Sequence, residues 1–221
     1  MQKNVDRLLH FEPIQYIFGH TLWYGLDLKV TPATLIPRPE TAELVTKVSN
    51  FMFPISNCRV LDIGTGSGCI AIALKKIHSE WDVTGIDVSA EAIRVAQENA
   101  VRNGVEVAFK VADIYDDNED FGTFDIVVSN PPYVRESEKA GMRTNVLKYE
   151  PGSALFVPDE DPLVFYRRIA ELHWGKFLFF EINEALGAEM KALMAKKGYT
   201  DIHITKDMYG KERIIEGRMV G

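Results

Sequence analysis

The sequence has 221 residues, of which 46% are hydrophobic and 26% are charged, a composition typical of one compact globular domain and not of a disordered or collagen-like chain. Lys and Arg total 25 against 32 Asp and Glu, so the formal net charge is -7 and a broad basic surface for duplex DNA is not expected.

Cysteine and histidine usage argues against disulfides and metal sites. Cys58 and Cys69 are the two cysteines, too few for a disulfide framework, and they favour a reducing cytoplasm. The five histidines are scattered, so no metal is expected. The longest uncharged stretch, Ile14 to Leu26, is too short and too polar for a membrane span.

The first 58 residues differ in pattern from the rest. Tyr16 to Thr31 alternates around two glycines and predicts a β-hairpin. Glu40 to Phe51 has helical spacing after the proline-stiffened loop LIPRPE at Leu35 to Glu40. We therefore expect residues 1–58 to form an N-terminal hairpin and linker helix ahead of a larger α/β domain at residues 59–221.

From Arg59 onward, short apolar runs alternate with stretches of helical spacing, which predicts parallel strands joined by helices. Strands are expected at Arg59 to Ile63, Asp82 to Ile86, Val105 to Val111, Phe124 to Ser129, Lys176 to Glu181, Tyr199 to Thr205 and Glu212 to Gly217. Helices are expected at Cys69 to Ile77, Ala90 to Arg102, Pro162 to Leu172 (with Asp161 as its cap) and Glu184 to Lys196. The predicted fold class is Rossmann-like α/β: a seven-stranded, mostly parallel sheet with helices on both faces.

A glycine-rich loop, DIGTGSG at Asp62 to Gly68, lies between the first of these strands and its helix. Glycines there let the backbone turn tightly and approach a ligand. Cys69 stands where a dinucleotide fingerprint has its third glycine, which argues against NAD. Asp87 ends the next strand, where a carboxylate can accept both hydroxyls of an adenosine ribose.

The tetrapeptide Asn130-Pro131-Pro132-Tyr133 follows the buried run FDIVVS. An amide or exocyclic amine is a weak nucleophile, so a methylating enzyme must hold that nitrogen in line with a sulfonium methyl group. The Asn130 side-chain oxygen and the Pro131 carbonyl can accept its two N–H groups, while Tyr133 can supply an aromatic wall. Two prolines stiffen the loop and fix the direction of the carbonyl.

Together, these motifs resemble the HemK/PrmC family, S-adenosylmethionine-dependent methyltransferases that modify the glutamine of a Gly-Gly-Gln motif in class 1 peptide chain release factors. The resemblance covers nearly the whole chain. It is carried by EPIQYIFG, LIPRPETAELV, LDIGTGSGCIAIAL, IDVSAEAI, FDIVVSNPPYV, YEPGSAL and DMYGKERIIEG.

The resemblance implies a cofactor site for S-adenosyl-L-methionine, with the glycine loop at its methionine end, Asp87 on the ribose and Ile114 against the adenine. The residues expected to bind the cofactor are Asp62, Gly64, Thr65, Gly66, Ser67, Gly68, Asp87, Val88, Asp113, Ile114 and Asn130. Those expected to hold the glutamine amide are Asn130, Pro131, Pro132 and Tyr133. The implied partner is a release factor, without direct DNA binding.

The loop residues Arg38, Pro39 and Glu40 either frame the cleft or form an ion-paired turn before a helix. Glu150 and Glu181 are expected to be structural. The sequence departs from the family pattern at Phe156 to Asp161, where a glycine-rich stretch is usual, and it has about ten residues where the family carries a helical domain ahead of Glu12. We expect that helical domain to be absent.

Three other functions compete with this interpretation. A DNA adenine-N6 methyltransferase also uses such an Asn-Pro-Pro loop, but the net charge and the LIPRPE block oppose it. A related enzyme that methylates a glutamine of a ribosomal protein typically lacks RPET, which this sequence has at Arg38 to Thr41. In a binding subunit without activity, the glycine loop or the NPPY motif would be expected to have lost its typical residues, and both motifs are intact.

Overall fold

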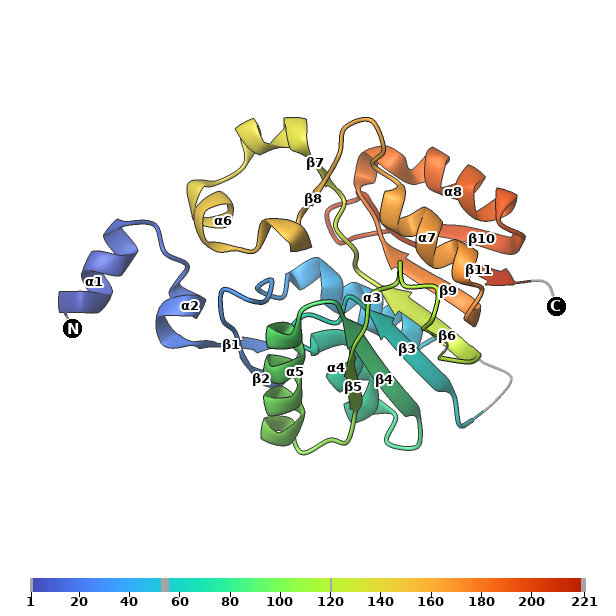
Figure 1. The fold of residues 1–221 in the computed structure, drawn as a ribbon, viewed down its shortest axis with the longest axis horizontal. Coiled ribbons are helices and arrows are strands. Elements are labelled where there is room, and N and C mark those ends of the chain that lie inside the picture. The colour runs from blue at the N-terminus through green and yellow to red at the C-terminus, as the bar shows by residue number, and fades with distance from the viewer. Residues whose placement is uncertain (1, 53–55, 120, 220–221) are drawn as a thin grey trace.

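A seven-stranded sheet forms the centre of the molecule, with helices on both of its faces (Figure 1). The structure is a computed structural model and describes residues 2–52, 56–119 and 121–219. The strands are β3 (Arg59–Ile63), β4 (Asp82–Asp87), β5 (Ala108–Val111), β6 (Phe124–Ser129), β9 (Gly175–Glu181), β10 (Tyr199–Lys206) and β11 (Glu212–Met219). Their order is β10-β11-β9-β6-β3-β4-β5. Among the described strands of this sheet, β11 pairs antiparallel with β10 and β9, and the remaining pairs are parallel, so the mostly parallel sheet is confirmed.

Helices cover both faces of this sheet because its central strands are apolar on both sides. The helices α3 (Pro39–Ser49), α4 (Cys69–Ile77) and α5 (Ala90–Asn103) lie on one face, and α7 (Val164–Leu172) and α8 (Gly187–Lys196) lie on the other. Neighbouring strand residues alternate between the two cores: Val60 and Phe179 contact the first group of helices, whereas Leu61 and Phe180 contact the second.

The N-terminal region contains α1 (Gln2–Leu9), α2 (Ile14–Phe18) and a hairpin of β1 (His20–Trp23) and β2 (Leu26–Lys29). The hairpin is confirmed, but its predicted start at Tyr16 is wrong. Residues 14–18 form a short helix that ends at Gly19, whose φ of +77° closes the turn. Tyr16 is buried there and donates a hydrogen bond to the Thr34 carbonyl.

Several predicted boundaries are corrected by the structure. The strand predicted from Val105 begins at Ala108, because pairing with β4 starts there. The helix predicted from Pro162 begins at Val164, and Asp161 pairs with Arg167 rather than capping it.

The stretch predicted as one helix from Glu184 is divided into η3 (Glu184–Leu186) and α8. Gly187 begins α8 beside the Glu212 carboxylate, which would have to move to make room for a Cβ at this position. The linker helix α3 ends at Ser49, two residues before the predicted end at Phe51.

An insertion between β6 and β9 was not predicted as ordered elements. It contains β7 (Val134–Arg135), η1 (Glu136–Gly141), α6 (Thr144–Tyr149), η2 (Gly152–Ala154) and β8 (Phe156–Val157). β7 and β8 pair in parallel. In Figure 1 this insertion projects above the carboxyl ends of the central strands.

Candidate active site

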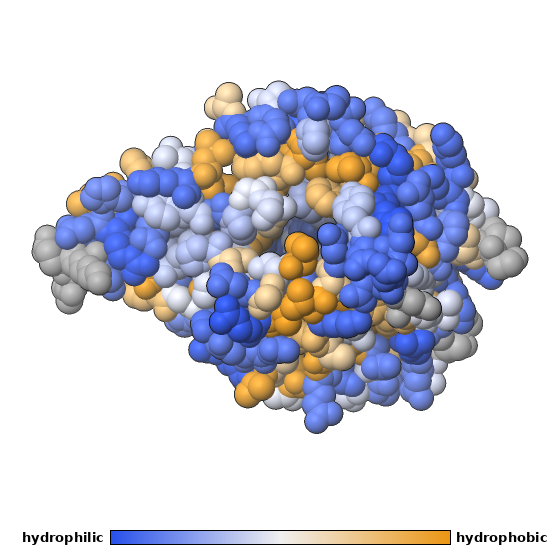
Figure 2. Space-filling view, in the orientation of Figure 1, coloured by the Kyte–Doolittle hydropathy of each residue, from blue (hydrophilic) through white to orange (hydrophobic). Residues whose placement is uncertain are grey.

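A cavity of about 500 Å³ opens at the carboxyl ends of β3, β4 and β6. After β3 the chain adds β4 and β5 on one side of it, and then returns to place β6 on the other side. The carboxyl ends of two strands related in this way are where α/β sheets bind ligands. Figure 2 shows a hollow near the middle of this face, bordered partly by hydrophobic residues. The predicted site residues that line the cavity are Arg38, Gly64, Thr65, Gly66, Ser67, Asp87, Val88, Asp113, Ile114, Asn130, Pro131 and Pro132.

The glycine loop after β3 needs its glycines for backbone geometry. Gly64, Gly66 and Gly68 have φ values of +71°, +54° and +80°, which L side chains rarely adopt. Gly68 does not line the cavity. A Cβ there would lie 3.0 Å from side-chain atoms of both Ala96 and Ile72, so Gly68 permits close packing of α4 instead.

Asp87 connects the end of β4 to this loop. Its Oδ2 accepts a hydrogen bond from the Gly66 amide at 2.9 Å, and its Oδ1 accepts one from the Ser89 amide at 2.9 Å. Burial raises the pKa of Asp87, and these two hydrogen bonds oppose that shift. Each carboxylate oxygen can accept a further hydrogen bond, so Asp87 can bind a diol in the cavity.

Asp62 lies behind the loop and not on the cavity wall. It is fully buried, and its Oδ2 accepts hydrogen bonds from the Thr65 hydroxyl at 2.6 Å and the Ala71 amide at 3.3 Å. Its Oδ1 has no partner among the described residues. Burial raises the pKa of Asp62 to about 7. In this structure Asp62 therefore holds the loop in place.

An apolar slot adjoins Asp87. Val88, which is 66% exposed, and Ile114 come from the ends of neighbouring strands and line one side of the cavity. Phe165 and Ile169 of α7 also line it. The Asp113 carboxylate accepts a hydrogen bond from the Tyr115 amide at 2.9 Å, which fixes the turn carrying Ile114. A flat apolar ring fits such a slot.

Asn130 and Pro131 line the cavity, and each has an oxygen that can accept a hydrogen bond. The Asn130 Nδ2 donates a hydrogen bond to the Thr41 hydroxyl oxygen at 3.2 Å. Within the described ranges, neither the Asn130 Oδ1 nor the Pro131 carbonyl accepts a hydrogen bond from the protein. Two neighbouring acceptors match the two donors of a primary amide nitrogen.

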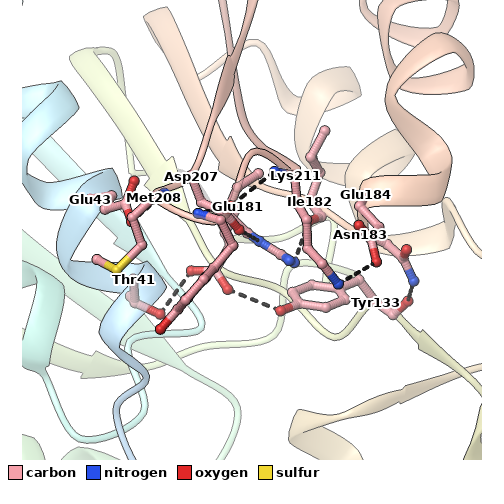
Figure 3. A network of polar contacts seen from close by, with 12 residues as sticks. Thr41, Glu43, Tyr133, Glu181, Ile182, Asn183, Glu184, Asp207, Met208 and Lys211 are labelled. Atoms are coloured by element: carbon pink, nitrogen blue, oxygen red, sulfur yellow. Dashed lines mark hydrogen bonds and ion pairs between the residues drawn. The ribbon is translucent and has the colours of Figure 1, made fainter.

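Tyr133 does not line the cavity, and its predicted role as an aromatic wall stays a prediction. Its hydroxyl donates to Glu181 Oε1 at 3.0 Å, while the Thr41 hydroxyl donates to Glu181 Oε2 at 2.7 Å. Figure 3 shows Glu181 between these two hydroxyl groups. Burial raises the pKa of Glu181 despite both bonds.

Of the three residues of the RPE loop, only Arg38 lines the cavity. Its guanidinium pairs with Glu150 at 2.7 Å, and the second oxygen of Glu150 accepts from the Ile36 amide at 3.1 Å. The loop is therefore held from inside by a buried carboxylate. Pro39 is exposed as the first residue of α3, and Glu40 is also absent from the cavity wall.

The lining residues that the sequence did not predict include Thr41, Phe165 and Ile169. Thr41 lies inside the LIPRPETAELV block, one position beyond Glu40, so the block was a usable signal for it. Phe165 and Ile169 have only the spacing of one helix face, which any helix packed on a sheet would show.

The described residues contain no group of three His, Cys, Asp or Glu side chains placed to hold a metal ion. Among the helices over the same residues, none has the length and apolarity that crossing a bilayer needs.

Comparisons with known proteins agree with this geometry. Residues 41–149 match the methyltransferase small domain family. A methyltransferase from Pyrococcus furiosus has a similar fold, with a TM-score of 0.66 at 21% identity over 100% of both chains. The sheet, the glycine loop and these matches define a class I, Rossmann-like methyltransferase.

Similarity to curated proteins gives the family. The release factor glutamine methyltransferase of Bacteroides thetaiotaomicron is 47% identical over 97% of this chain and 79% of its own length. That of Flavobacterium psychrophilum is 47% identical over 93% of this chain and 75% of its own length. The chain belongs to the release factor glutamine methyltransferase family.

Proposed function

We propose that this protein transfers a methyl group from S-adenosyl-L-methionine to the side-chain amide nitrogen of a glutamine in a peptide chain release factor. The observation that carries the proposal is that one cavity brings together the glycine loop, Asp87, and the two free acceptors of Asn130 and Pro131. The first two form a nucleoside site, and the acceptors form an amide site.

The cavity fits the cofactor in size and in chemistry. Asp87 is placed to accept the ribose hydroxyls, and the slot of Val88 and Ile114 to hold the adenine. Among the described residues that line the cavity, Arg38 is the only lysine or arginine. It would therefore attract the carboxylate of the methionine part. The glycine loop lines the same cavity and would lie at the methionine end.

The protein's part in the reaction is to hold and orient the amide. The Asn130 Oδ1 and the Pro131 carbonyl would each accept one N–H of the glutamine side chain, which keeps the nitrogen lone pair directed at the methyl group. When bound, S-adenosylmethionine would supply this methyl group from its sulfonium, would leave as the neutral thioether that keeps the electron pair, and the amide nitrogen would lose one proton to water. Positive charge spreads during transfer, which a dry and oriented pocket favours.

A protein substrate is favoured over DNA by the acidic balance of the chain. The relatives named above act, by their names, on release factors, and we extend that substrate to this chain ahead of a ribosomal protein. We also propose a cytoplasmic location, since both cysteines are buried free thiols. Residues 59–221 are proposed as the catalytic domain.

Replacement of Asn130 tests this function. In Asn130→Ala, single-turnover methyl transfer to a release factor should fall by roughly 100-fold or more, since the amide loses an acceptor that positions it. Cofactor affinity, measured by calorimetry, should stay nearly unchanged. Equal loss of binding and transfer would contradict the assigned role. Labelled cofactor offered separately with a release factor, a ribosomal protein and duplex DNA identifies the substrate, and label on DNA alone would overturn the proposal.

A further inference from the structure

One buried carboxylate is connected to both ends of the NPPY segment, directly to Tyr133 and through Thr41 to Asn130. Glu181, 1% exposed at the end of β9, accepts hydrogen bonds from Tyr133 directly and from Thr41, which in turn bonds to Asn130. Thr41, Tyr133 and Glu181 come from α3, the loop after β6, and β9, so they are far apart in sequence and meet only in the fold (Figure 3).

Proton counting fixes the direction of each hydrogen bond in this chain. When Glu181 is ionised, its carboxylate only accepts, so Thr41 must donate its single hydroxyl proton to it, at 2.7 Å. The Thr41 oxygen can then offer only lone pairs to Asn130, 3.2 Å away. Asn130 must therefore direct its NH₂ group at Thr41, which leaves its Oδ1 for the cavity.

The orientation of the Asn130 side-chain amide matters because its oxygen and its NH₂ group have nearly the same shape, but the oxygen accepts hydrogen bonds and the NH₂ group donates them. With Oδ1 in the cavity, Asn130 can accept from the glutamine N–H. With the amide turned over, its NH₂ group would face the NH₂ group of the substrate, and neither could accept.

We propose that Thr41 and Glu181 are positioning residues that select the productive orientation of the Asn130 amide. The inference rests on the proposed function, since it concerns how the glutamine amide is held. Thr41 is 3% exposed, so water does not replace its hydroxyl readily. Tyr133 gives Glu181 its second donor, so the same carboxylate also anchors the far end of the NPPY loop.

Isosteric replacement of Thr41 separates orientation from packing. Thr41→Val keeps the shape but removes the acceptor for Asn130, and single-turnover transfer to a release factor should fall roughly 10- to 100-fold, as expected for a misaligned reacting group. Thr41→Ser restores the hydroxyl and should recover most of the rate. Thr46→Val, an exposed position on the same helix α3, is the matched control and should match the wild type.

Two further variants make the test specific. In the Asn130→Ala background, Thr41→Val should have no additional effect, because Thr41 acts only through Asn130. Glu181→Leu removes the acceptor that fixes the Thr41 proton and should reduce transfer by a similar factor, so it provides a second route if Thr41→Val does not fold. Cofactor affinity, measured by calorimetry, should change less than threefold in every variant.

The outcomes of these experiments separate a failure of the positioning role from a failure of the proposed methyltransferase function. If a folded Thr41→Val protein transfers methyl at the wild-type rate, or if its effect adds fully to that of Asn130→Ala, the positioning role is overturned. If the wild-type protein binds cofactor but does not label a release factor, the proposed function fails, and the positioning role for that reaction fails with it.

Discussion

The side-chain amide of Asn99 exchanges two hydrogen bonds with the backbone of Lys29. Its Oδ1 accepts from the Lys29 N–H at 2.7 Å, and its Nδ2 donates to the Lys29 carbonyl at 3.0 Å. One turn later on α5, Asn103 makes the same exchange with Asp27, at 3.2 and 3.0 Å. The hairpin strand β2 is thus paired with a helix through two asparagines.

Asn99 also connects the hairpin to the candidate active site, because its Nδ2 donates to the carbonyl of Ser67 in the glycine loop at 2.9 Å. We predict that Asn99→Ala lowers the free energy of unfolding by about 2–4 kcal/mol, since it leaves the part-buried backbone groups of Lys29 and the buried Ser67 carbonyl without these partners. Cofactor affinity should fall as well, because Ser67 loses its support. Urea unfolding and calorimetry measure the two effects.

Asn103→Ala is the matched control for that experiment. It removes the equivalent exchange at a less buried position and does not contact the glycine loop. We expect a smaller loss of stability, about 1 kcal/mol, with cofactor affinity unchanged. A loss of affinity as large as that of Asn99→Ala would show that the hairpin, and not Ser67, transmits the effect.

Asp87→Asn should weaken cofactor binding by roughly 10- to 100-fold, because hydrogen bonds to a charged group contribute about 1.5–3 kcal/mol. The amide also brings a donor to a site that contains the Gly66 and Ser89 N–H groups. Asp82→Asn, at the opposite end of the same strand and exposed, controls for the change in net charge. An unchanged dissociation constant in Asp87→Asn would remove Asp87 from the ribose site.

The bounds of strands and helices were predicted correctly where hydrophobic patterning alone determined them. Strands β3 and β6 and helix α4 have their predicted bounds, because an apolar run buried on both faces leaves few alternatives. The signal failed at Val105 to Val107, which are partly apolar but lack a strand partner. Strand bounds depend on the neighbour's length, which a local pattern does not contain.

The sequence predicted the motif residues of the candidate site but not the residues that hold those motifs in place. The glycine loop, Asp87 and Asn130 could be found because each lies at the end of a strand or directly after one. The contact between Thr41 and Glu181 joins residues 140 positions apart, and nothing in either local sequence indicates it. The same holds for Asp62, whose burial behind the loop follows from packing and not from its motif.

Gly68→Ala should be more harmful than an equal change at another left-handed glycine. Both Gly68 and Gly104 have positive φ, +80° and +66°, but only at Gly68 would the added methyl group meet neighbours, at 3.0 Å from Ala96 and Ile72. We expect Gly104→Ala to lose about 1 kcal/mol from backbone strain. Gly68→Ala should lose about 2–4 kcal/mol, with overpacking added, and should also bind cofactor less well. Similar melting temperatures for the two variants would contradict this packing argument.

Asp62 should make stability depend on pH. Burial raises its pKa from 3.8 to about 7, so between those values the folded protein holds a proton that the unfolded chain has released. Its contribution to the free energy of unfolding is therefore fully present below about pH 4 and is lost as the pH rises through about 7. Asp62→Asn stays neutral throughout, so the stability of the variant relative to the wild type should increase as the pH rises across this range.

Asp116→Asn is the control. Its exposed carboxyl has a lowered pKa, so the difference in stability between Asp116→Asn and the wild type should stay constant above pH 4. Urea unfolding of the three proteins at several pH values checks the prediction, and a constant difference between Asp62→Asn and the wild type would mean that Asp62 does not retain its proton in the folded protein.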